Sequence, residues 1–443
     1  MPQLKAGAAQ LDVTPGLGAH LLGYFTDRRA AEIHDPLNAK AISITNGDTT
    51  LGFVICDVIV VPGAVADAAK AIIQDRIGVP PENVLIAGTH THTGPAIIGA
   101  LGTPEEEGYA EWVAPRLADA FIMAYQRMEP AQFAHAAGSV PGEVHNRRWH
   151  MKDGTVRMNP GYLNPDAIRP AGPTDPQFGL IVLRRPEGEP LAALGNLSLH
   201  YVGLHGGDHN VVCADYFAAF GRALNRIAGA CCGVGAPFVC PLANGTFGDV
   251  NNCDFTRPAP TSRHPYQQIE RVANVVAAEA WRLWNGVREE DFRDDIPLGA
   301  RLDLVDFPAR CPTPEEVAAA KERYEGDADW GDGEWLYARE IVLLADEPTE
   351  WPVPIHTMRI GDLGIVGLAG EVFTQIGLDI KARSPFAQTM NIGIANDSVG
   401  YVATDQALDE GSYETRLCRH VRAPKGTHRL WVDTAVAGLA SLT

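Results

Sequence analysis

Positive charge is scarce in this sequence. It contains 36 Lys and Arg residues against 55 Asp and Glu residues, which gives a formal net charge of -19 at pH 7. A surface that binds nucleic acid needs an excess of basic residues, and so does adhesion to an anionic membrane. We therefore expect no nucleic-acid partner and no stable membrane association. A small-molecule substrate fits this composition, and a homo-oligomer is compatible with it.

Long apolar runs and paired cysteines are also missing. No segment approaches the roughly 20 apolar residues of a membrane-spanning helix. The first twelve residues contain one lysine and no apolar core, so we expect no secretory signal. The eight cysteines are scattered and form no C-x-x-C pair, which favours reduced thiols over structural disulfides or a cysteine metal site. Together these absences predict a cytoplasmic enzyme.

The elements that are present predict an α/β protein. Two apolar runs, 41–44 and 51–56, flank Asn46-Gly47-Asp48, a strong hairpin signal. A helical pattern over 64–77 and a buried strand over 84–87 follow, and a strand–helix–strand unit of this kind is typical of layered domains. We expect a layered mixed β-sheet core flanked by helices. Because no linker or repeat interrupts the chain, we expect residues 1–443 to form a single domain.

Further elements are expected along the remaining chain. The segment 151–176 is rich in Gly, Pro, Asn and Asp, which predicts a long loop of the kind that lines sites. The segment 310–332 reads as a charged surface excursion, helical over 314–324. Apolar spacing predicts the other helices and strands: helices beginning near Glu106 and over 215–230 and 269–283, and strands over 133–140, 180–183, 191–200, 237–240, 355–360, 363–368 and 390–395.

Two histidines follow the apolar strand 84–87. The sequence Gly88-Thr89-His90-Thr91-His92-Thr93-Gly94-Pro95 ends this strand in a loop. In an extended segment, residues i and i+2 project to the same side, so His90 and His92 are expected to point into one cleft. Open α/β sheets usually bind ligands at the carboxyl ends of their strands. The alternative is a pair of ordinary polar loop residues.

Other polar residues also follow apolar strands: His200, Asp249, Glu371 and Tyr401. Zinc sites in hydrolases are commonly built from histidine and carboxylate ligands, with one position open for water. Two histidines and one glutamate match that composition. The ligands are separated in sequence, so no fixed spacing of the H-E-x-x-H kind supports the choice, and 14 histidines offer many combinations.

Eight short motifs follow one another along the chain. In order, they are Ala6–Asp12 with Val13-Thr14-Pro15, Gly23-Tyr24, His90-Thr91-His92-Thr93-Gly94-Pro95, Asn146-Arg147, Asn196-Leu197-Ser198-Leu199-His200, Gly248-Asp249-Val250-Asn251-Asn252, Gly370-Glu371, and Gly400-Tyr401 with Thr404, Tyr413 and Glu414. In this order they resemble the neutral/alkaline, non-lysosomal ceramidase superfamily of zinc amidases. The resemblance covers most of the chain and corresponds to the catalytic domain. It implies a small, soluble, bacterial-type homologue with that family's layered fold.

The resemblance also implies roles for individual residues. His90, His200 and Glu371 correspond to zinc ligands, and Tyr401 to a fourth or intermittent ligand, although a buried structural tyrosine is the alternative. His92 corresponds to a catalytic neighbour that carries the proton to the leaving amine. Arg147 and Tyr413 correspond to donors to the substrate or oxyanion, with Arg148 as an alternative to Arg147. Asp249 is expected to orient a histidine ligand from behind.

The departures from the family bear on the substrate. Asn251 stands where the family has a catalytic serine, and an amide cannot act as an alkoxide nucleophile. We therefore expect chemistry that depends on activated water, with Asn251 retained as a candidate catalytic position. We also expect no carboxyl-terminal immunoglobulin-like domain, which together with the expected lack of a secretion signal makes ceramide itself a doubtful substrate.

Three classes of function follow from these residues. The first is a zinc-dependent amidohydrolase that cleaves the C–N amide bond of a small or medium N-acyl compound. The second is an esterase, lactonase or cyclic-amide hydrolase on the same scaffold. The third is a metal-binding protein without hydrolytic activity, which the change from serine to Asn251 leaves open.

Overall fold

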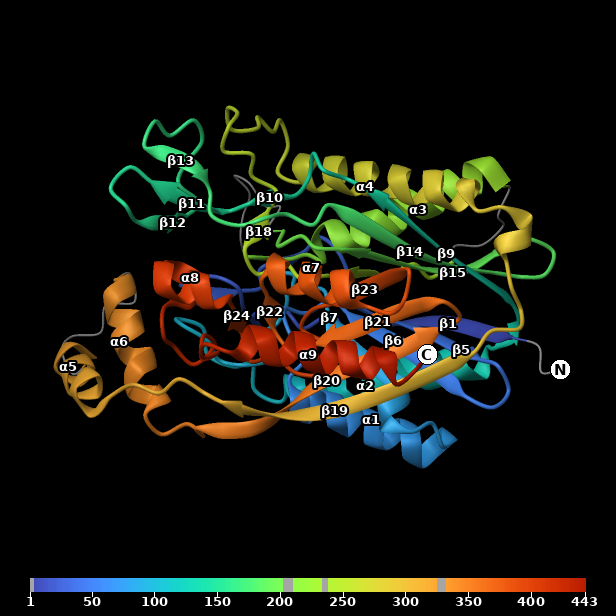
Figure 1. Ribbon diagram of the computed structural model, residues 1–443, viewed down its shortest axis with the longest axis horizontal. Coiled ribbons are helices and arrows are strands. Elements are labelled where there is room, and N and C mark those ends of the chain that lie inside the picture. Colours follow the sequence, from blue (N-terminus) through green and yellow to red (C-terminus); the bar gives the residue numbers. More distant parts are fainter. Residues whose placement is uncertain (1–3, 202–209, 233–237, 325–331) are drawn as a thin grey trace.

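Three β-sheets form the centre of the molecule, and helices cover them (Figure 1). The computed structural model describes residues 4–201, 210–232, 238–324 and 332–443. The first sheet has the order β7-β6-β5-β1-β8, in which β6 and β7 run parallel. Its strands are β1 (Lys5–Asp12), β5 (Asn38–Thr45), β6 (Thr50–Cys56), β7 (Val84–Gly88) and β8 (Glu129–Pro130). The predicted hairpin between β5 and β6 is confirmed, with Thr45 opposite Thr50.

Two four-stranded sheets complete the core. One has the order β17-β15-β14-β9, and the other has the order β19-β20-β21-β23. Their strands are β9 (Gln132–Ser139), β14 (Gln177–Arg184), β15 (Pro190–Leu197), β17 (Leu242–Asn244), β19 (Leu298–Pro308), β20 (Glu350–Ile360), β21 (Leu363–Leu368) and β23 (Gln388–Ile392). Two further short strands, β22 (Glu371–Val372) and β24 (Tyr401–Val402), pair in parallel.

Side chains alternate between two packed layers along the strands of the first sheet. Ile42 and Phe53 belong to a core that also contains residues of the other two sheets. Ala41 and Val54, one residue away, belong to the core that the helices cover. This period of two follows from the pleat of a β-strand. The expected layered mixed-sheet core flanked by helices is confirmed.

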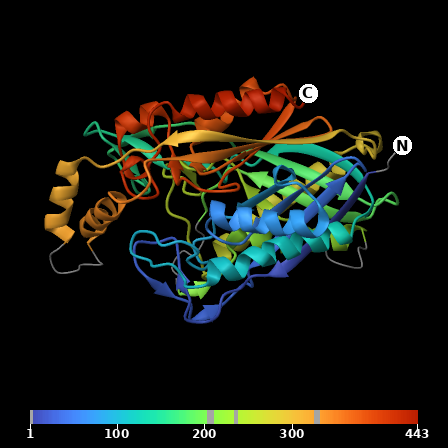
Figure 2. The same ribbon diagram turned by 90° about the horizontal axis from the view of Figure 1, so that it is seen from below.

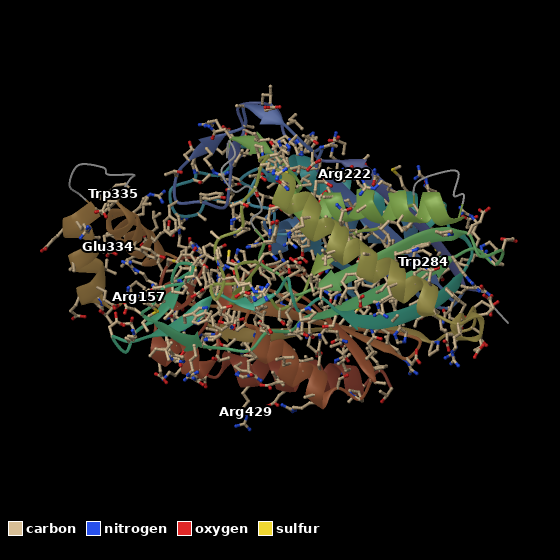
Figure 3. The ribbon with its side chains drawn as sticks, turned by 90° about the horizontal axis from the view of Figure 1, so that it is seen from above. Arg157, Arg222, Trp284, Glu334, Trp335 and Arg429 are labelled. Atoms are coloured by element: carbon tan, nitrogen blue, oxygen red, sulfur yellow. The ribbon has the colours of Figure 1, made fainter. Side chains whose placement is uncertain are left out.

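The helices cover the outer faces of these sheets. Helices α1 and α2 contact each other and α2 packs on the first sheet, while α3 and α4 pair beside the second and α9 lies on the third (Figure 2). Trp284 of α4 is buried against Phe238, as expected for the apolar face of that helix (Figure 3). The helices are α1 (Gly63–Ile77), α2 (Tyr109–Gln126), α3 (Asp215–Cys232), α4 (Gln267–Gly286), α5 (Pro314–Tyr324), α6 (Gly333–Leu344), α7 (Thr374–Arg383), α8 (Asp405–Glu410) and α9 (Thr427–Ala440). No described helix is long and apolar enough to cross a bilayer.

Several expectations need correction. The segment 151–176 is not one structureless loop, because it contains two strands that pair with a third in a small antiparallel sheet. Of the strand expected over 237–240, residue 237 lies outside the described residues and the rest forms only an isolated bridge between Val239 and Ala192; the strand begins at Leu242. Strand β19 and helices α6, α8 and α9 were not predicted. The remaining short strands are β2 (His20–Leu21), β3 (Arg28–Arg29), β4 (Glu32–Ile33), β10 (His145–Asn146), β11 (Arg148–Met151), β12 (Val156–Met158), β13 (Ala167–Pro170), β16 (Val211–Val212) and β18 (Val250–Asn251).

Candidate metal centre

Three histidines converge at one end of the sheets. The candidate ligand atoms of His90, His92 and His200 all lie within 4.8 Å of one another. His90 and His92 follow β7, and His200 follows β15. These strands come together because Asn244, at the end of β17, accepts a hydrogen bond from the Leu199 backbone and donates one to the Thr89 carbonyl. The other loop histidines, His205 and His209, lie outside the described residues.

The backbone at His90 departs from the extended conformation that the sequence suggested. Its φ angle is 74°, in the left-handed region that non-glycine residues rarely occupy. Backbone strain of this kind persists only where the surroundings enforce it, and it is concentrated at functional sites. The expectation that both histidines enter one site is met by the geometry, but a sharp turn rather than strand alternation brings them together.

A carboxylate completes the cluster. Glu371 Oε2 lies 3.3 Å from His90 Nε2 and 3.7 Å from His200 Nδ1. This oxygen is buried and has no hydrogen-bond partner among the described residues. Burial alone raises the pKa of Glu371, but the neighbouring His90 and Tyr401 outweigh it and lower the pKa to about 2. An ionised, buried oxygen without a partner needs a cation to offset its desolvation.

The nitrogen atoms are also arranged as metal ligands are. His90 Nδ1 lies 2.9 Å from the Ile59 carbonyl, an acceptor that can orient the ring, and its Nε2 faces Glu371. His92 Nε2 lies 3.1 Å from His200 Nε2. Zinc–nitrogen distances of about 2.0–2.1 Å place neighbouring ligands of a tetrahedral ion about 3.3 Å apart. The separations between His92 Nε2 and His200 Nε2 and between His90 Nε2 and Glu371 Oε2 match that spacing, whereas His200 faces Glu371 through Nδ1.

The imidazoles of His92 and His200 are held in their neutral form. Burial lowers the pKa of His92 well below its ordinary value, and the nearby His90 lowers it further. Burial and then Arg147 lower the pKa of His200 in the same way. Neutral imidazole is the form that binds metal. A metal would therefore displace few protons from these two rings at neutral pH.

Tyr401 stands beside Glu371 because the two short strands that carry them pair in parallel, with these residues opposite each other. Its hydroxyl accepts a 3.0 Å hydrogen bond from Arg147 Nη2. Burial raises the pKa of Tyr401 well above its ordinary value, and Glu371 adds to the effect. Tyr401 is thus a neutral phenol between an arginine and the carboxylate of the cluster.

Arg147 lies behind the cluster rather than in front of it. It is buried, and it donates to Glu414 Oε1, His200 Nδ1, the Gly248 carbonyl and the Tyr401 hydroxyl. These bonds use four of the five N–H groups of a guanidinium. Arg148 pairs with the other oxygen of Glu414 and donates to the Gly411 carbonyl. Of the two arginines, Arg147 is the one that reaches the histidines.

A small cavity opens onto the cluster. Its volume is about 160 Å³. Its lining residues include four from the cluster (His90, His92, Glu371 and Tyr401), apolar residues from the first third of the chain (Leu22, Ile59, Val60, Ile98 and Leu101), and polar residues from the last part (Ser398, Tyr413, Arg419 and His420). A larger cavity of about 690 Å³, between β5 and α3, contains none of the cluster residues.

Tyr413 lines the small cavity beside the metal cluster, as expected of a residue that contacts substrate. Its ring lies 5.8 Å from the ring of Tyr401 and 6.0 Å from that of Phe25, measured between centroids. Burial raises the pKa of Tyr413 above its ordinary value, with smaller effects from Tyr337 and Glu371. Its hydroxyl is therefore a neutral hydrogen-bond donor.

Two expected residues are placed elsewhere. Asn251 does not line the cavity; its amide donates to Asn159 Oδ1 at 2.8 Å and accepts from the Cys253 backbone. The expectation for Asp249 is wrong. Its carboxylate accepts from Thr374 and from Asn146 instead of from a histidine. Asp249 therefore fixes the start of α7, just after Glu371.

Sequence reasoning missed the residues that hold His92. Gly23, with φ of 125°, lies so close that an added Cβ would come within 2.6 Å of the His92 Cβ. Arg28 donates to the His92 carbonyl at 2.6 Å and to the Leu22 carbonyl at 3.1 Å. The glycine-rich loop was visible in the sequence, but nothing in the pattern of Gly23-Tyr24 indicated which side chain it contacts. Glu414, which joins the two arginines, was noticed only as a neighbour of Tyr413.

Comparison with known proteins gives a consistent result. No family model matches the chain. The neutral ceramidase of Mycobacterium tuberculosis is 23% identical over 93% of this chain and 73% of its own length. The neutral ceramidase of Pseudomonas aeruginosa is 22% identical over 80% of this chain, which spans 59% of that relative's length.

Solved structures agree. The crystal structure of neutral ceramidase from Pseudomonas aeruginosa superposes with a TM-score of 0.76 at 19% identity, over 100% of this chain and 75% of the other. A structure described as ceramidase complexed with C2 superposes with the same TM-score at 18% identity. In sequence and in fold, the chain is therefore similar to the neutral ceramidases. These similarities bear out the resemblance recognised from the motifs, and the fold is confirmed.

Proposed function

We propose that this protein is a zinc-dependent amidohydrolase that cleaves the C–N bond of a small or medium N-acyl compound with an activated water molecule. The observation that carries the proposal is the buried Glu371 oxygen without a partner, placed among three histidine rings. Homology to neutral ceramidases supports amide-bond hydrolysis as the reaction class. The cytoplasmic location and the single-domain organisation remain predictions.

The donor set fits zinc. His90, His200 and Glu371 would hold the ion, and Tyr401, which strand pairing places beside Glu371, would be a fourth or intermittent ligand. His92, whose Nε2 lies 3.1 Å from His200 Nε2, would stand next to the ion as the proton carrier. Zinc with such ligands lowers the pKa of a bound water toward neutrality and polarises a carbonyl group.

Proton transfer is assigned to His92. Hydrolysis adds water across the amide: the acyl carbon gains the hydroxyl, and the nitrogen gains the proton and leaves as an amine. His92 lines the cavity as a neutral imidazole. Imidazole is the side chain that most often accepts and returns a proton near neutral pH. When a substrate occupies the cavity, His92 is the neighbouring base that can pass the proton to the leaving nitrogen.

The remaining residues bind or position. Tyr413 is a neutral donor in the cavity and is placed to hydrogen-bond the reacting amide. Arg147 is assigned as a positioning residue, because its contacts fix His200 and Tyr401 and it does not line the cavity. Asn251 lies outside the cavity and is not assigned a bond-making role. A mechanism based on activated water needs no nucleophile at that position.

The size of the cavity bears on the substrate. Sites that enclose drug-sized ligands measure roughly 300–1,000 Å³, and this cavity measures about 160 Å³. A short N-acyl group fits this space, with its chain against the apolar wall. We therefore propose a small substrate in preference to a long-chain lipid.

A metal assay and a hydrolysis panel test this function. Purified protein should contain one zinc ion per chain and hydrolyse at least one member of a panel of N-acyl amides. His90→Ala should lose both the ion and the activity, whereas His135→Ala, which alters a histidine bonded to Asp362 and Gln388 outside the cluster, should lose neither. Turnover of esters or lactams alone would support the esterase or lactonase alternative. Zinc binding without turnover of any compound would support a non-catalytic protein, and full activity of His90→Ala would refute the mechanism.

A further inference from the structure

The cavity has a second polar end, formed by Arg419 and His420. Both residues line the small cavity together with Leu101. Neither residue is part of the proposed metal centre. Helix α6, at the end of the molecule shared with α5 (Figure 1), supplies the residue that anchors this end, Glu340. Glu340 is fully buried and is contacted by two arginines, Arg339 and Arg419.

Arg419 is held so that one edge of its guanidinium stays available. Nε and Nη2 each donate to one oxygen of Glu340, at 2.8 Å. A guanidinium has five N–H groups and can present two parallel forks. Glu340 takes the Nε/Nη2 fork, which leaves the Nη1/Nη2 fork, and Nη1 has no hydrogen-bond partner within the described part of the chain. The Glu340 pair therefore orients Arg419 without using all of its donors.

His420 offers a second group beside it. Its Nδ1 is buried without a hydrogen-bond partner among the residues that the structure describes. Its other nitrogen, Nε2, lies 3.6 Å from Cys418 Sγ. If the thiol donates to Nε2, the ring proton is on Nδ1, and Nδ1 is then a donor. A buried donor without a partner destabilises the unliganded protein, and a ligand that accepts its hydrogen bond would remove this penalty.

Other charges near this end are already engaged or distant from it. Arg339 donates to Glu340 and to the Leu101 carbonyl. Arg416 forms a two-bond pair with Glu334, at 2.7 Å for both bonds. Glu347 is exposed to solvent, where screening weakens its effect on Arg419. Glu371 lies in the metal cluster, where a zinc ion would offset its charge.

We infer that the substrate carries a carboxylate, and that Arg419 and His420 bind it. This inference rests on the proposed amidohydrolase function and narrows its substrate to N-acyl amino acids or compounds of the same charge pattern. The apolar wall receives the acyl chain, the metal cluster faces the amide, and the Arg419 end receives the carboxylate of the amine portion. Hydrolysis then adds water across the C–N bond and yields a fatty acid and an amino acid.

A pair of matched probes tests this assignment. N-hexanoylglycine and N-hexanoylglycinamide differ only in a carboxylate against a neutral carboxamide. Charge-assisted hydrogen bonds from an arginine favour the carboxylate, so wild-type protein should prefer N-hexanoylglycine at least about tenfold in kcat/KM and in calorimetric binding. In Arg419→Met the ratio should fall to about one, and Arg419→Lys should retain part of it. His420→Gln should reduce the ratio by about threefold.

Arg416→Met is the matched control. Arg416 belongs to the same segment and forms the same kind of pair, with Glu334 on α6 (Figure 3), but it does not line the cavity. This variant should keep the tenfold preference. Equal handling of both probes by folded wild-type protein, or a preference that survives in Arg419→Met, would overturn the inference. If neither probe is hydrolysed but binding shows the Arg419-dependent preference, the carboxylate site stands and the amidohydrolase proposal fails.

Discussion

The two ends of the cavity bury charge in different ways. At the metal end, Glu371 keeps an oxygen without a hydrogen-bond partner among the described residues, and burial lowers the pKa of His92 and of His200 beside it. At the arginine end, the fully buried Glu340 is neutralised by Arg419 and Arg339 from within the chain. Because a buried charge needs a partner, the metal end requires an added cation and the arginine end does not. The metal end therefore needs a bound ion to balance its charge, whereas the charges of the arginine end balance one another within the protein.

The largest effects are expected when the buried glutamate at each end of the cavity is replaced by glutamine. Glu371→Gln should lose zinc and lower kcat/KM by at least about a thousandfold, because metal catalysis contributes several kcal/mol to transition-state stabilisation. Glu340→Gln should keep its zinc, measured by mass spectrometry of the metal content. It should unfold at lower denaturant concentration, because two arginines lose a buried partner. Zinc retained in Glu371→Gln would contradict the comparison.

The adjacent arginines Arg147 and Arg148 separate support of the metal end from general stability. Both contact the buried Glu414, so replacing either by Met should destabilise the fold by about 3–5 kcal/mol. Only Arg147 contacts His200 and Tyr401. Arg147→Met should therefore weaken zinc binding by about 10–100-fold, as loss of a ligand-orienting group does, and Arg148→Met should not. Equal zinc affinities in the two variants, measured by chelator competition, would refute the positioning role.

Gly400 lies between the two ends of the cavity, next to Tyr401 in the chain and in contact with the backbone of His420. Gly400 has φ of 73°, and an added Cβ would lie 1.7 Å from the His420 carbonyl oxygen, which also accepts from the Tyr401 backbone. Gly400→Ala should therefore destabilise the fold by about 3 kcal/mol or more. Gly426→Ala, at φ of 89° but with open space around it, should cost only about 1 kcal/mol. Urea unfolding of both variants measures the difference, and similar midpoints would show that the Gly400 contact is unimportant.

The smallest effect is expected at Asn251, outside both ends. Its side chain bonds to Asn159 and to the Cys253 backbone, and it does not line the cavity. Asn251→Ser, which restores the residue type of the resembling family, should change kcat/KM by less than about threefold, since a partly exposed side chain away from the chemistry contributes little. A change of a hundredfold in either direction would return this position to the catalytic machinery.

The sequence predicted the metal end better than the arginine end for a physical reason. Zinc ligands are restricted to a few side-chain types placed after strands, so His90, His200 and Glu371 stand out with their motifs. Arg419 and His420 belong to no such pattern. Their role depends on α6, which was not predicted, because Glu340 has to arrive from a segment 79 residues away before Arg419 is oriented.

In the fold as well, elements set by local sequence signals could be predicted and elements set by long-range contacts could not. The hairpin of β5 and β6 and the helix α1 follow from local signals, namely a turn dipeptide and helical spacing. Strand β19 has a single buried residue and is otherwise partly or fully exposed, so it lacks a clear apolar alternation, and its pairing with β20 is a long-range contact. The turn at His90 was also hidden, because positive φ in a histidine depends on contacts such as those to Val58 and Ile59.

Location of the metal is the most direct test of the account. A crystal structure of zinc-loaded protein, with anomalous diffraction recorded at the zinc edge, should show one peak per chain in contact with His90, His200 and Glu371. The same data should show whether Tyr401 is the fourth ligand, with His92 beside the ion and not bound to it. A peak elsewhere in the chain, or none in protein that hydrolyses amides, would contradict the zinc centre on which the proposed function depends.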